Sequence, residues 1–160
     1  MIIPARLDQQ GSPARVVFDT NVLLSLWVFD DSRFSPLRAM IDQGEWLALT
    51  GDLCLAEFKR VLGYPQFALS EERQAEIYLS YASIAQRCDE KPTLPPLPRC
   101  SDRDDQKFLE LARHANAGWL VTTDKALLKM ARRSKLAGLF YIVTPDVVLA
   151  GLEASAAMAA

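Results

Sequence analysis

The sequence contains few of the residues that build soft-metal sites or covalent cross-links. It has one histidine, His114, and three cysteines, Cys54, Cys88 and Cys100, which lie far apart in the chain. Their separation matches no zinc-binding spacing, and an odd number of cysteines does not form a complete disulfide framework. We therefore expect free thiols in a reducing compartment, and no catalysis that depends on several histidines.

Long apolar runs and an excess of one charge are also missing. No apolar run approaches the ~20 residues that cross a bilayer, and the segment from Met1 to Arg15 lacks the basic-then-apolar pattern of a signal peptide. These features predict a cytoplasmic protein without a membrane partner. The 18 basic and 20 acidic residues leave a net charge of −2. This balance excludes a protein that coats nucleic acid through bulk charge, but not a nuclease whose carboxylates are neutralised by divalent ions.

The 160 residues are enough for one domain with a hydrophobic core. Segments with the apolar character of strands alternate with segments of helical periodicity; the strand-like segments are 15–19, 46–50, 119–122 and 140–143. This alternation is typical of a parallel sheet covered by helices on both faces. We assign 1–14 to an N-terminal arm, 15–150 to the folded domain and 151–160 to a C-terminal tail. Four prolines between Pro92 and Pro98 exclude regular helix there and favour a stiff connector over a ligand for a partner domain.

Two of the strand-like segments lead to an acid. The apolar residues Val16 to Phe18 run directly into Asp19, and the strand beginning at Trp119 is followed by two threonines and Asp124. The carboxyl ends of parallel strands share the edge of the sheet where open α/β folds bind ligands. The two acids are therefore predicted to converge on one site, although each could instead serve only as the N-cap of the helix that follows.

A third acid borders the apolar face of a predicted helix. This helix follows the second strand, with Thr50 or Asp52 as its expected cap, and it carries Glu57 along one edge of its apolar stripe. A carboxylate in that position either faces a cleft or pairs with a neighbouring base, here Lys59 or Arg60.

Three more acids crowd one predicted helix start. Asp102, Asp104 and Asp105 open a helix predicted over 102–117, with Ser101 as the expected cap of a capping box. Capping and the helix dipole explain one or two of these acids. Like charges this close repel one another unless a cation lies among them. Helical spacing alone does not choose between Asp104 and Asp105.

Taken together, these segments place acids from four parts of the chain on one edge of a parallel sheet. Ligand sets made only of oxygen suit Mg²⁺ or Mn²⁺ and disfavour soft metals. Such ions activate a water and clamp phosphate oxygens without a histidine base. The pattern therefore predicts phosphoryl-transfer chemistry at a divalent-metal site.

A basic stripe begins beside the last of these acids. On a helix predicted over 125–135, four bases fall on one face: Lys125, Lys129, Arg132 and Arg133. A cationic face that leads away from a metal site would hold a phosphate backbone. The alternative is an ordinary solvated helix face whose last-turn charges suit the helix dipole.

Four segments, in their order along the chain, resemble the PIN-domain family, and more narrowly those members that are toxin components of toxin–antitoxin systems. The segments are Val16–Val22, Glu57 with Val61 and Leu62, Cys100–Ala112, and Val121–Leu128. The similarity covers roughly residues 15–150. It implies a three-layer α/β/α sandwich with a central, mainly parallel sheet of four to five strands, and metal-dependent cleavage of RNA.

Position by position, the resemblance assigns the catalytic and metal-binding roles to Asp19, Glu57, Asp105 and Asp124. Asp105 is preferred to Asp104 because the family pattern places an aromatic or aliphatic residue three positions after the acid and an alanine seven after, here Phe108 and Ala112. Two polar residues, Asn21 and Thr122, match those that support the cleft. Asp102 matches an additional acid and is a candidate metal ligand, whereas Gln106 replaces a frequent third acid.

The resemblance also implies partners. Besides an RNA substrate and Mg²⁺ or Mn²⁺, family members usually form homodimers, and the toxins pair with a small antitoxin protein. Two other functions remain open. A phosphatase of the haloacid dehalogenase type needs a second acid where this chain has Asn21. A non-catalytic PIN-like module would bind RNA or protein, and its RNA binding would be insensitive to Mg²⁺ and to loss of Asp19.

Overall fold

The computed structural model of the protein describes residues 13–133 and 139–159. Most of the predicted N-terminal arm, 1–14, lies outside these ranges. The last two residues of the helix predicted over 125–135 also lie outside them.

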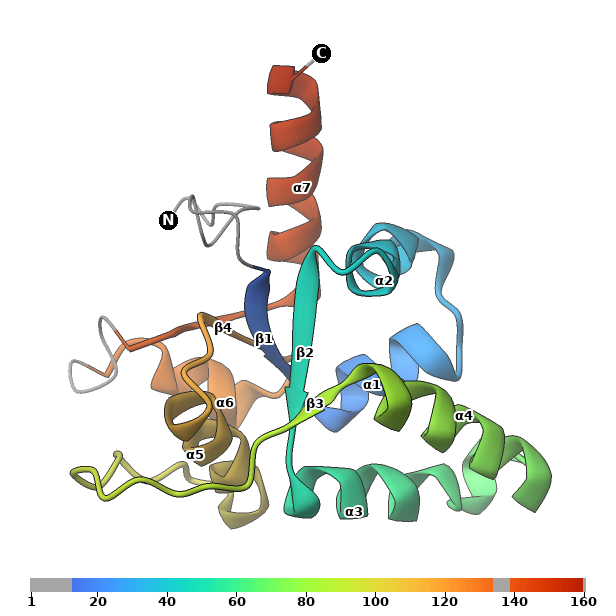
Figure 1. Cartoon of the computed structure of the whole chain (residues 1–160), viewed down its shortest axis with the longest axis horizontal. Helices are drawn as coiled ribbons and strands as arrows, with labels where there is room; N and C mark the ends of the chain where they lie inside the picture. The colour runs from blue at the N-terminus through green and yellow to red at the C-terminus, as the bar shows by residue number, and fades with distance from the viewer. Residues whose placement is uncertain (1–12, 134–138, 160) are drawn as a thin grey trace.

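The described residues form one parallel sheet with helices around it (Figure 1). The strands are β1 (Ala14–Phe18), β2 (Trp46–Thr50), β3 (Gln86–Arg87), β4 (Trp119–Val121) and β5 (Tyr141–Val143). They are paired in the order β3-β2-β1-β4-β5, and every pair is parallel. The predicted parallel sheet of four to five strands is therefore confirmed.

The helices follow the strands along the chain. The α-helices are α1 (Thr20–Trp27), α2 (Ser35–Asp42), α3 (Asp52–Leu62), α4 (Glu71–Ile84), α5 (Gln106–His114), α6 (Lys125–Met130) and α7 (Pro145–Ala159). Short 3₁₀ turns occur at η1 (Ser32–Phe34), η2 (Pro65–Phe67) and η3 (Arg103–Asp105). The proline-rich segment after β3 contains no regular element, as its composition predicts. None of the helices in the described ranges has the length and apolar character needed to cross a membrane.

Successive residues of a strand point to opposite faces of the sheet, and helices cover both faces. In β1, Val16 and Phe18 pack into a hydrophobic cluster with α1 to α4 and the start of α7. Val17, between them, packs on the opposite face with residues of α5 and α6. Figure 1 shows α5 and α6 on one side of the sheet and α1, α3 and α4 on the other. Both faces of β1 are covered, which suits the apolar run Val16 to Phe18, and the three-layer α/β/α architecture is confirmed.

The strand order defines where the fold can bind a ligand. The chain winds from β1 outward to β2 and β3, and then returns to place β4 on the other side of β1. A crevice forms at the carboxyl ends of the strands where the winding direction changes, here between β1 and β4. The backbone amide of Asp19 donates to the carbonyl of Val121 at 3.0 Å, so the ends of these two strands are held side by side.

Two helix caps differ from the sequence prediction. The N-cap of α3 is Gly51 rather than Thr50 or Asp52, and the amide of Asp52 donates to the Asp89 carboxylate at 2.8 Å. A side chain at Gly51 would place its Cβ 3.0 Å from that same carboxylate. At the other helix start the cap is Asp102 instead of Ser101, because the Asp102 carboxylate accepts from the Asp104 amide at 2.9 Å and opens a 3₁₀ turn before α5.

Three element boundaries also differ. The edge strand β3 was not predicted, because Gln86 and Arg87 are exposed and pair with β2 only through the backbone. Helix α6 ends at Met130, so Arg132 and Arg133 lie beyond it. Helix α7 extends to Ala159, through most of the segment 151–160 that was expected to form a tail, and it projects from the body of the protein (Figure 1).

Candidate active site

All four acids predicted for the site line one cleft at the carboxyl end of the sheet. The cleft has a volume of about 140 Å³, and its walls are Asp19, Thr20, Asn21, Glu57, Val61, Asp105, Phe108 and Asp124. A water molecule occupies ~30 Å³ in the liquid. The cleft therefore has room for an ion with a few waters.

Asp19 is fixed by hydrogen bonds to both of its carboxylate oxygens. It is 2% exposed, and one oxygen accepts from the Val22 amide at 2.9 Å, which makes Asp19 the N-cap of α1. The other oxygen accepts from the hydroxyl of Thr122. Burial raises the pKa of Asp19, although both hydrogen bonds lower it. Asp19 therefore caps α1 and lines the cleft at the same time.

Thr122 connects the ends of the two central strands. Its side chain is completely buried, and its hydroxyl donates to Asp19 while accepting from the Asp124 amide at 2.9 Å. A hydroxyl can donate once and accept at the same time, whereas no apolar side chain could do either. Thr122 therefore orients two of the acids without facing the cleft itself.

Asp124 and Asp105 meet on the other side of the cleft. Asp124 caps α6, with one oxygen accepting from the amides of Ala126 and Leu127 at 2.8 and 3.2 Å. Asp105 has a buried carboxylate oxygen that no hydrogen bond satisfies among the described residues. Desolvation, followed by the charge of Asp124, raises the pKa of Asp105 to about 7. Two acids are thus held close together, at an electrostatic cost to the metal-free protein.

The donor set fits a hard divalent cation. Asp102, Asp105 and Asp124 each offer a carboxylate oxygen, and these oxygens lie within 4.8 Å of one another. Oxygens bound ~2.1 Å from one Mg²⁺ are at most ~4.2 Å apart, so small side-chain movements would close the set around an ion. A cation there would also satisfy the unpaired buried oxygen of Asp105. Because every donor is a carboxylate, Mg²⁺ or Mn²⁺ suits the set better than a soft metal.

Asp104 occupies a different environment from its neighbours. It is exposed and lines neither the cleft nor the acid cluster, whereas Asp102 is exposed but belongs to the cluster. Of the two acids between which helical spacing does not choose, Asp105 lines the cleft and Asp104 does not.

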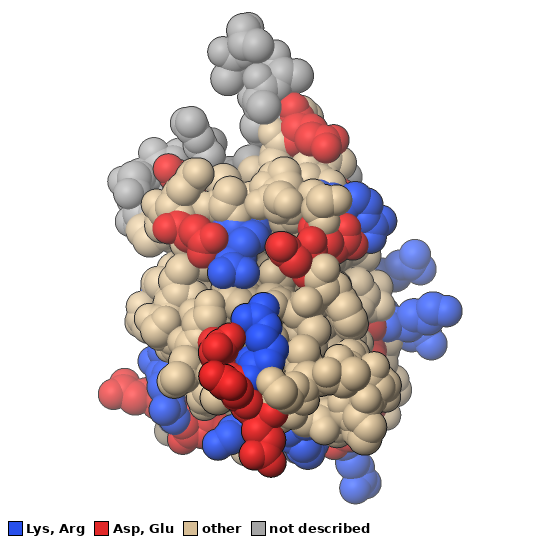
Figure 2. Space-filling view, turned by 90° about the vertical axis from the view of Figure 1, so that its right-hand side faces the viewer, with Lys and Arg blue, Asp and Glu red and all other residues tan. Residues whose placement is uncertain are grey.

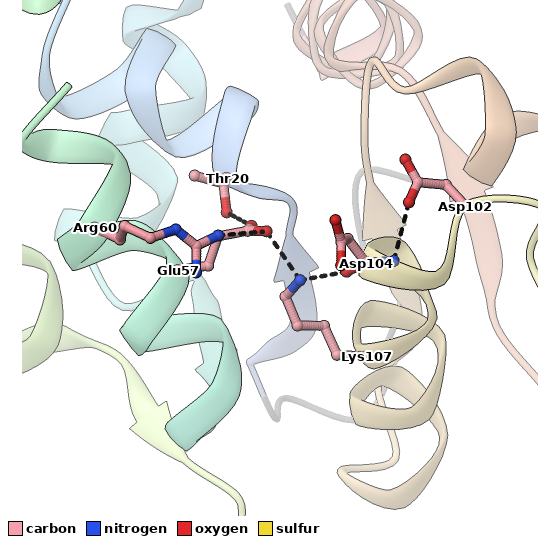
Figure 3. Close-up of polar contacts among 6 residues, drawn as sticks. All are labelled: Thr20, Glu57, Arg60, Asp102, Asp104 and Lys107. Carbon is pink, nitrogen blue, oxygen red and sulfur yellow. Dashed lines mark hydrogen bonds and ion pairs between the residues drawn. The ribbon is translucent and has the colours of Figure 1, made fainter. Parts of the chain in front are cut away.

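Glu57 lies across the cleft and is held by two partners (Figure 3). One of its oxygens accepts from the hydroxyl of Thr20, and the other lies 2.9 Å from the amine of Lys107. Arg60, predicted as a partner, approaches only to 4.0 Å and is mostly exposed. The paired side chains of Glu57 and Lys107 are 15% and 16% exposed. Glu57 is thus partly desolvated and lies outside the cluster of three aspartates.

Lys107 is the site residue that sequence reasoning missed. It reaches from α5 toward α3, and its amine also donates to the backbone carbonyl of Asp104 (Figure 3). The bridge joins residues 50 positions apart. Its only sequence signal is a base at the border of the apolar stripe of α5, which is the kind of position that identified Glu57.

The predicted basic residues surround the site less regularly than expected. Lys125, which follows Asp124, and Lys129 are exposed on α6. Arg132 and Arg133 are also exposed but lie after the helix, so the four bases do not share one helix face. Among the supporting residues, Asn21 is exposed at the cleft wall.

Comparison with known families agrees with this geometry. A family model described as a PIN domain matches residues 15–126, which include most of β1, all four predicted acids and the acid cluster. No curated protein matches the chain significantly. PIN domains are generally nucleases that use divalent metals, and the acidic cluster is compatible with such a site. The match spans most of the chain, and the chain therefore belongs to the PIN-domain family.

Proposed function

We propose that this PIN domain is a metal-dependent endoribonuclease that hydrolyses RNA phosphodiester bonds with Mg²⁺ or Mn²⁺. The observation that supports the proposal is the convergence of Asp19, Glu57, Asp105 and Asp124 on one cleft. Carboxylates grouped around a divalent ion activate a bound water, so we expect hydrolysis there to use water as the nucleophile.

Asp105, Asp124 and Asp102 would hold the ion, and Asp19 would complete the set. Each oxygen of Asp19 accepts one hydrogen bond, and a carboxylate oxygen has a second lone pair that can still ligate. When bound, a divalent ion lowers the pKa of a coordinated water and stabilises charge on the phosphate oxygens.

The remaining residues position these groups. Thr122 holds Asp19 and the backbone of Asp124 in place. Glu57, kept in orientation by Thr20 and Lys107, would ligate the ion or orient the attacking water and accept its proton. The exposed bases Lys125 and Lys129 follow directly from the cleft and would contact the RNA backbone, with Arg132 and Arg133 beyond them.

The resemblance to toxin components supports a further proposal, that the enzyme is the toxin of a toxin–antitoxin pair in the cytoplasm. A homodimer and a cognate antitoxin protein would then be its partners, with residues 15–150 forming the catalytic domain. The alternative is a PIN-like module that binds RNA or protein without cutting. The phosphatase alternative is disfavoured because Asn21 cannot serve as the second acid.

Cleavage of labelled RNA by purified protein, with Mg²⁺, with Mn²⁺ and with EDTA, tests the proposal. The matched variants are Asp105→Asn, which faces the cleft, and Asp104→Asn, which is adjacent and exposed. We expect metal-dependent cutting that falls by orders of magnitude in Asp105→Asn only. Equal cutting by both variants would reject the assigned site. RNA binding without cutting, insensitive to metal and to Asp19→Asn, would favour the binding module.

A further inference from the structure

A second hollow is lined by the chain segment that also carries two of the clustered acids. It has a volume of about 590 Å³ and is lined by Arg99, Cys100, Ser101, Arg103 and Gln106. The same stretch of chain supplies both sites, because Asp102 and Asp105 belong to the acid cluster while the residues around them line the hollow. Since consecutive Cα atoms are ~3.8 Å apart, the hollow begins about one residue from the candidate metal ligands.

The floor of the hollow is built by one buried glutamine. Gln106 is 8% exposed. Its side-chain oxygen accepts from the Cys100 amide at 2.7 Å, and its nitrogen donates to the Pro98 carbonyl and to Glu110, both at 3.2 Å. Cys100 is also buried in the hydrophobic cluster that contains α5. The loop that carries Arg99 is therefore tied to the first turn of α5.

The two arginines of the hollow differ from most others in the protein. Arg33, Arg38, Arg60, Arg73, Arg87 and Arg113 each pair with an acid. Arg99 and Arg103 are exposed and form no ion pair with any residue of the described ranges. Their guanidinium groups are free to bind an anion, and the planar fork of donors matches a phosphate.

A protein with this charge balance needs local groups of bases to bind a polyanion. Figure 2 shows a face on which basic and acidic side chains are interspersed, and the net charge is −2. Bulk charge would therefore not hold a polyanion against the acidic cleft. A strand whose scissile phosphate lies over the acids needs nearby cations to hold its adjoining phosphates.

We propose that this hollow, here called the arginine hollow, binds a backbone phosphate and its nucleotide in single-stranded RNA, next to the scissile phosphate. This inference rests on the proposed ribonuclease function and names a substrate subsite for it. The volume of the arginine hollow falls in the usual range for ligand pockets, ~300–1,000 Å³. The acidic cleft, at about 140 Å³, takes only the reacting centre.

The test is RNA binding and cleavage by an Arg99→Gln, Arg103→Gln double variant. Fluorescence anisotropy of a labelled single-stranded RNA in EDTA, over ~50–200 mM salt, gives the affinity and its salt dependence. We expect a loss of roughly tenfold or more in affinity, and a salt slope shallower by about 0.7 for each lost phosphate contact. In the presence of Mn²⁺, KM should rise with little change in kcat.

The control is Arg73→Gln, on α4 on the other side of the sheet from α5, where Arg73 pairs with Glu76 (Figure 1). It should leave affinity, salt slope and KM unchanged. Thermal denaturation of each variant confirms that the exposed substitutions leave the fold intact.

Different outcomes separate the two proposals. If the wild type cuts RNA and the double variant binds it with unchanged affinity and slope, the arginine hollow is not a subsite. If the wild type neither binds nor cuts RNA, the ribonuclease proposal and this one both fail. Binding of inorganic phosphate or a mononucleotide as tightly as RNA would overturn the RNA strand as the occupant.

Discussion

Replacing Asp105 by asparagine should stabilise the metal-free protein at pH 8. Desolvation and the neighbouring charge of Asp124 raise the pKa of Asp105 from an ordinary 3.8 to about 7. The folded state thus resists ionisation of this carboxyl, and asparagine is a neutral substitute of the same shape. Asp105 makes no side-chain cap bond to α5, so the substitution removes no cap.

The size of the expected stabilisation follows from the change in the pKa of Asp105. One pKa unit corresponds to ~1.4 kcal/mol, so a shift of about three units sets an upper limit of roughly 4 kcal/mol. The Asp105 side chain is partly exposed, and solvent screens its interaction with Asp124, so we expect a gain of about 1–2 kcal/mol. For a domain of this size that is a rise of roughly 2–8 °C in Tm.

The pH dependence has a definite sign. Because the folded pKa of Asp105 is raised, the stability associated with its neutral form is present below about pH 4 and is lost as the pH rises through about 7. The increase in the free energy of unfolding caused by Asp105→Asn should therefore be absent near pH 4 and complete above pH 7.

Thermal and urea denaturation of wild type, Asp105→Asn and Asp104→Asn in EDTA, at pH 4.5 and pH 8, provide the measurement. Mn²⁺ should then stabilise the wild type more than Asp105→Asn, because the ion binds only the folded ligand set. A loss of stability in Asp105→Asn at pH 8, or an equal gain in the exposed Asp104→Asn, would refute the reasoning.

Three further predictions concern the cleft. Lys107→Met removes the amine that pairs with the partly desolvated Glu57 carboxylate. We expect the free energy of unfolding, measured with urea, to fall by about 1–3 kcal/mol, and Mn²⁺ to bind more tightly by calorimetry. An unchanged Mn²⁺ affinity would show that the Lys107 charge does not act at the metal. Thr122→Val removes the hydroxyl that donates to Asp19 and accepts from the Asp124 amide, and it should lower the free energy of unfolding by about 1–3 kcal/mol. The control Thr123→Val, at an exposed position, should change it by less than ~0.5 kcal/mol. Glu57→Gln should lower kcat at least ~100-fold while Mn²⁺ affinity changes little; a matching loss of affinity would make Glu57 a ligand instead.

Local sequence patterns were sufficient to predict the main strands of the sheet. Residues 46–50 form a strand with the predicted bounds, because an apolar run between turn signals is decided by neighbouring residues. The acids at the ends of β1 and β4 were found for the same reason, since the position after a parallel strand has a fixed meaning in an α/β sheet.

Features that depend on distant residues were not predictable. The edge strand β3 has no apolar pattern, because only its backbone pairs with β2. The start of α3 is capped by Asp89, 37 residues away, which no local capping rule identifies. The basic residues after Met130 fit a helical wheel, but α6 ends at Met130 and does not continue through Arg132 and Arg133.

The sequence by itself determined the fold class and the edge of the sheet where the candidate acids gather, because strand and helix periods and the parallel α/β rule are local or topological. Only the tertiary structure brought Lys107 to Glu57 and formed the arginine hollow, and it places Asp105, which the family pattern already favoured over Asp104, at the cleft wall. Those features depend on side-chain directions and on packing between segments up to a hundred residues apart, and linear spacing carries no record of either.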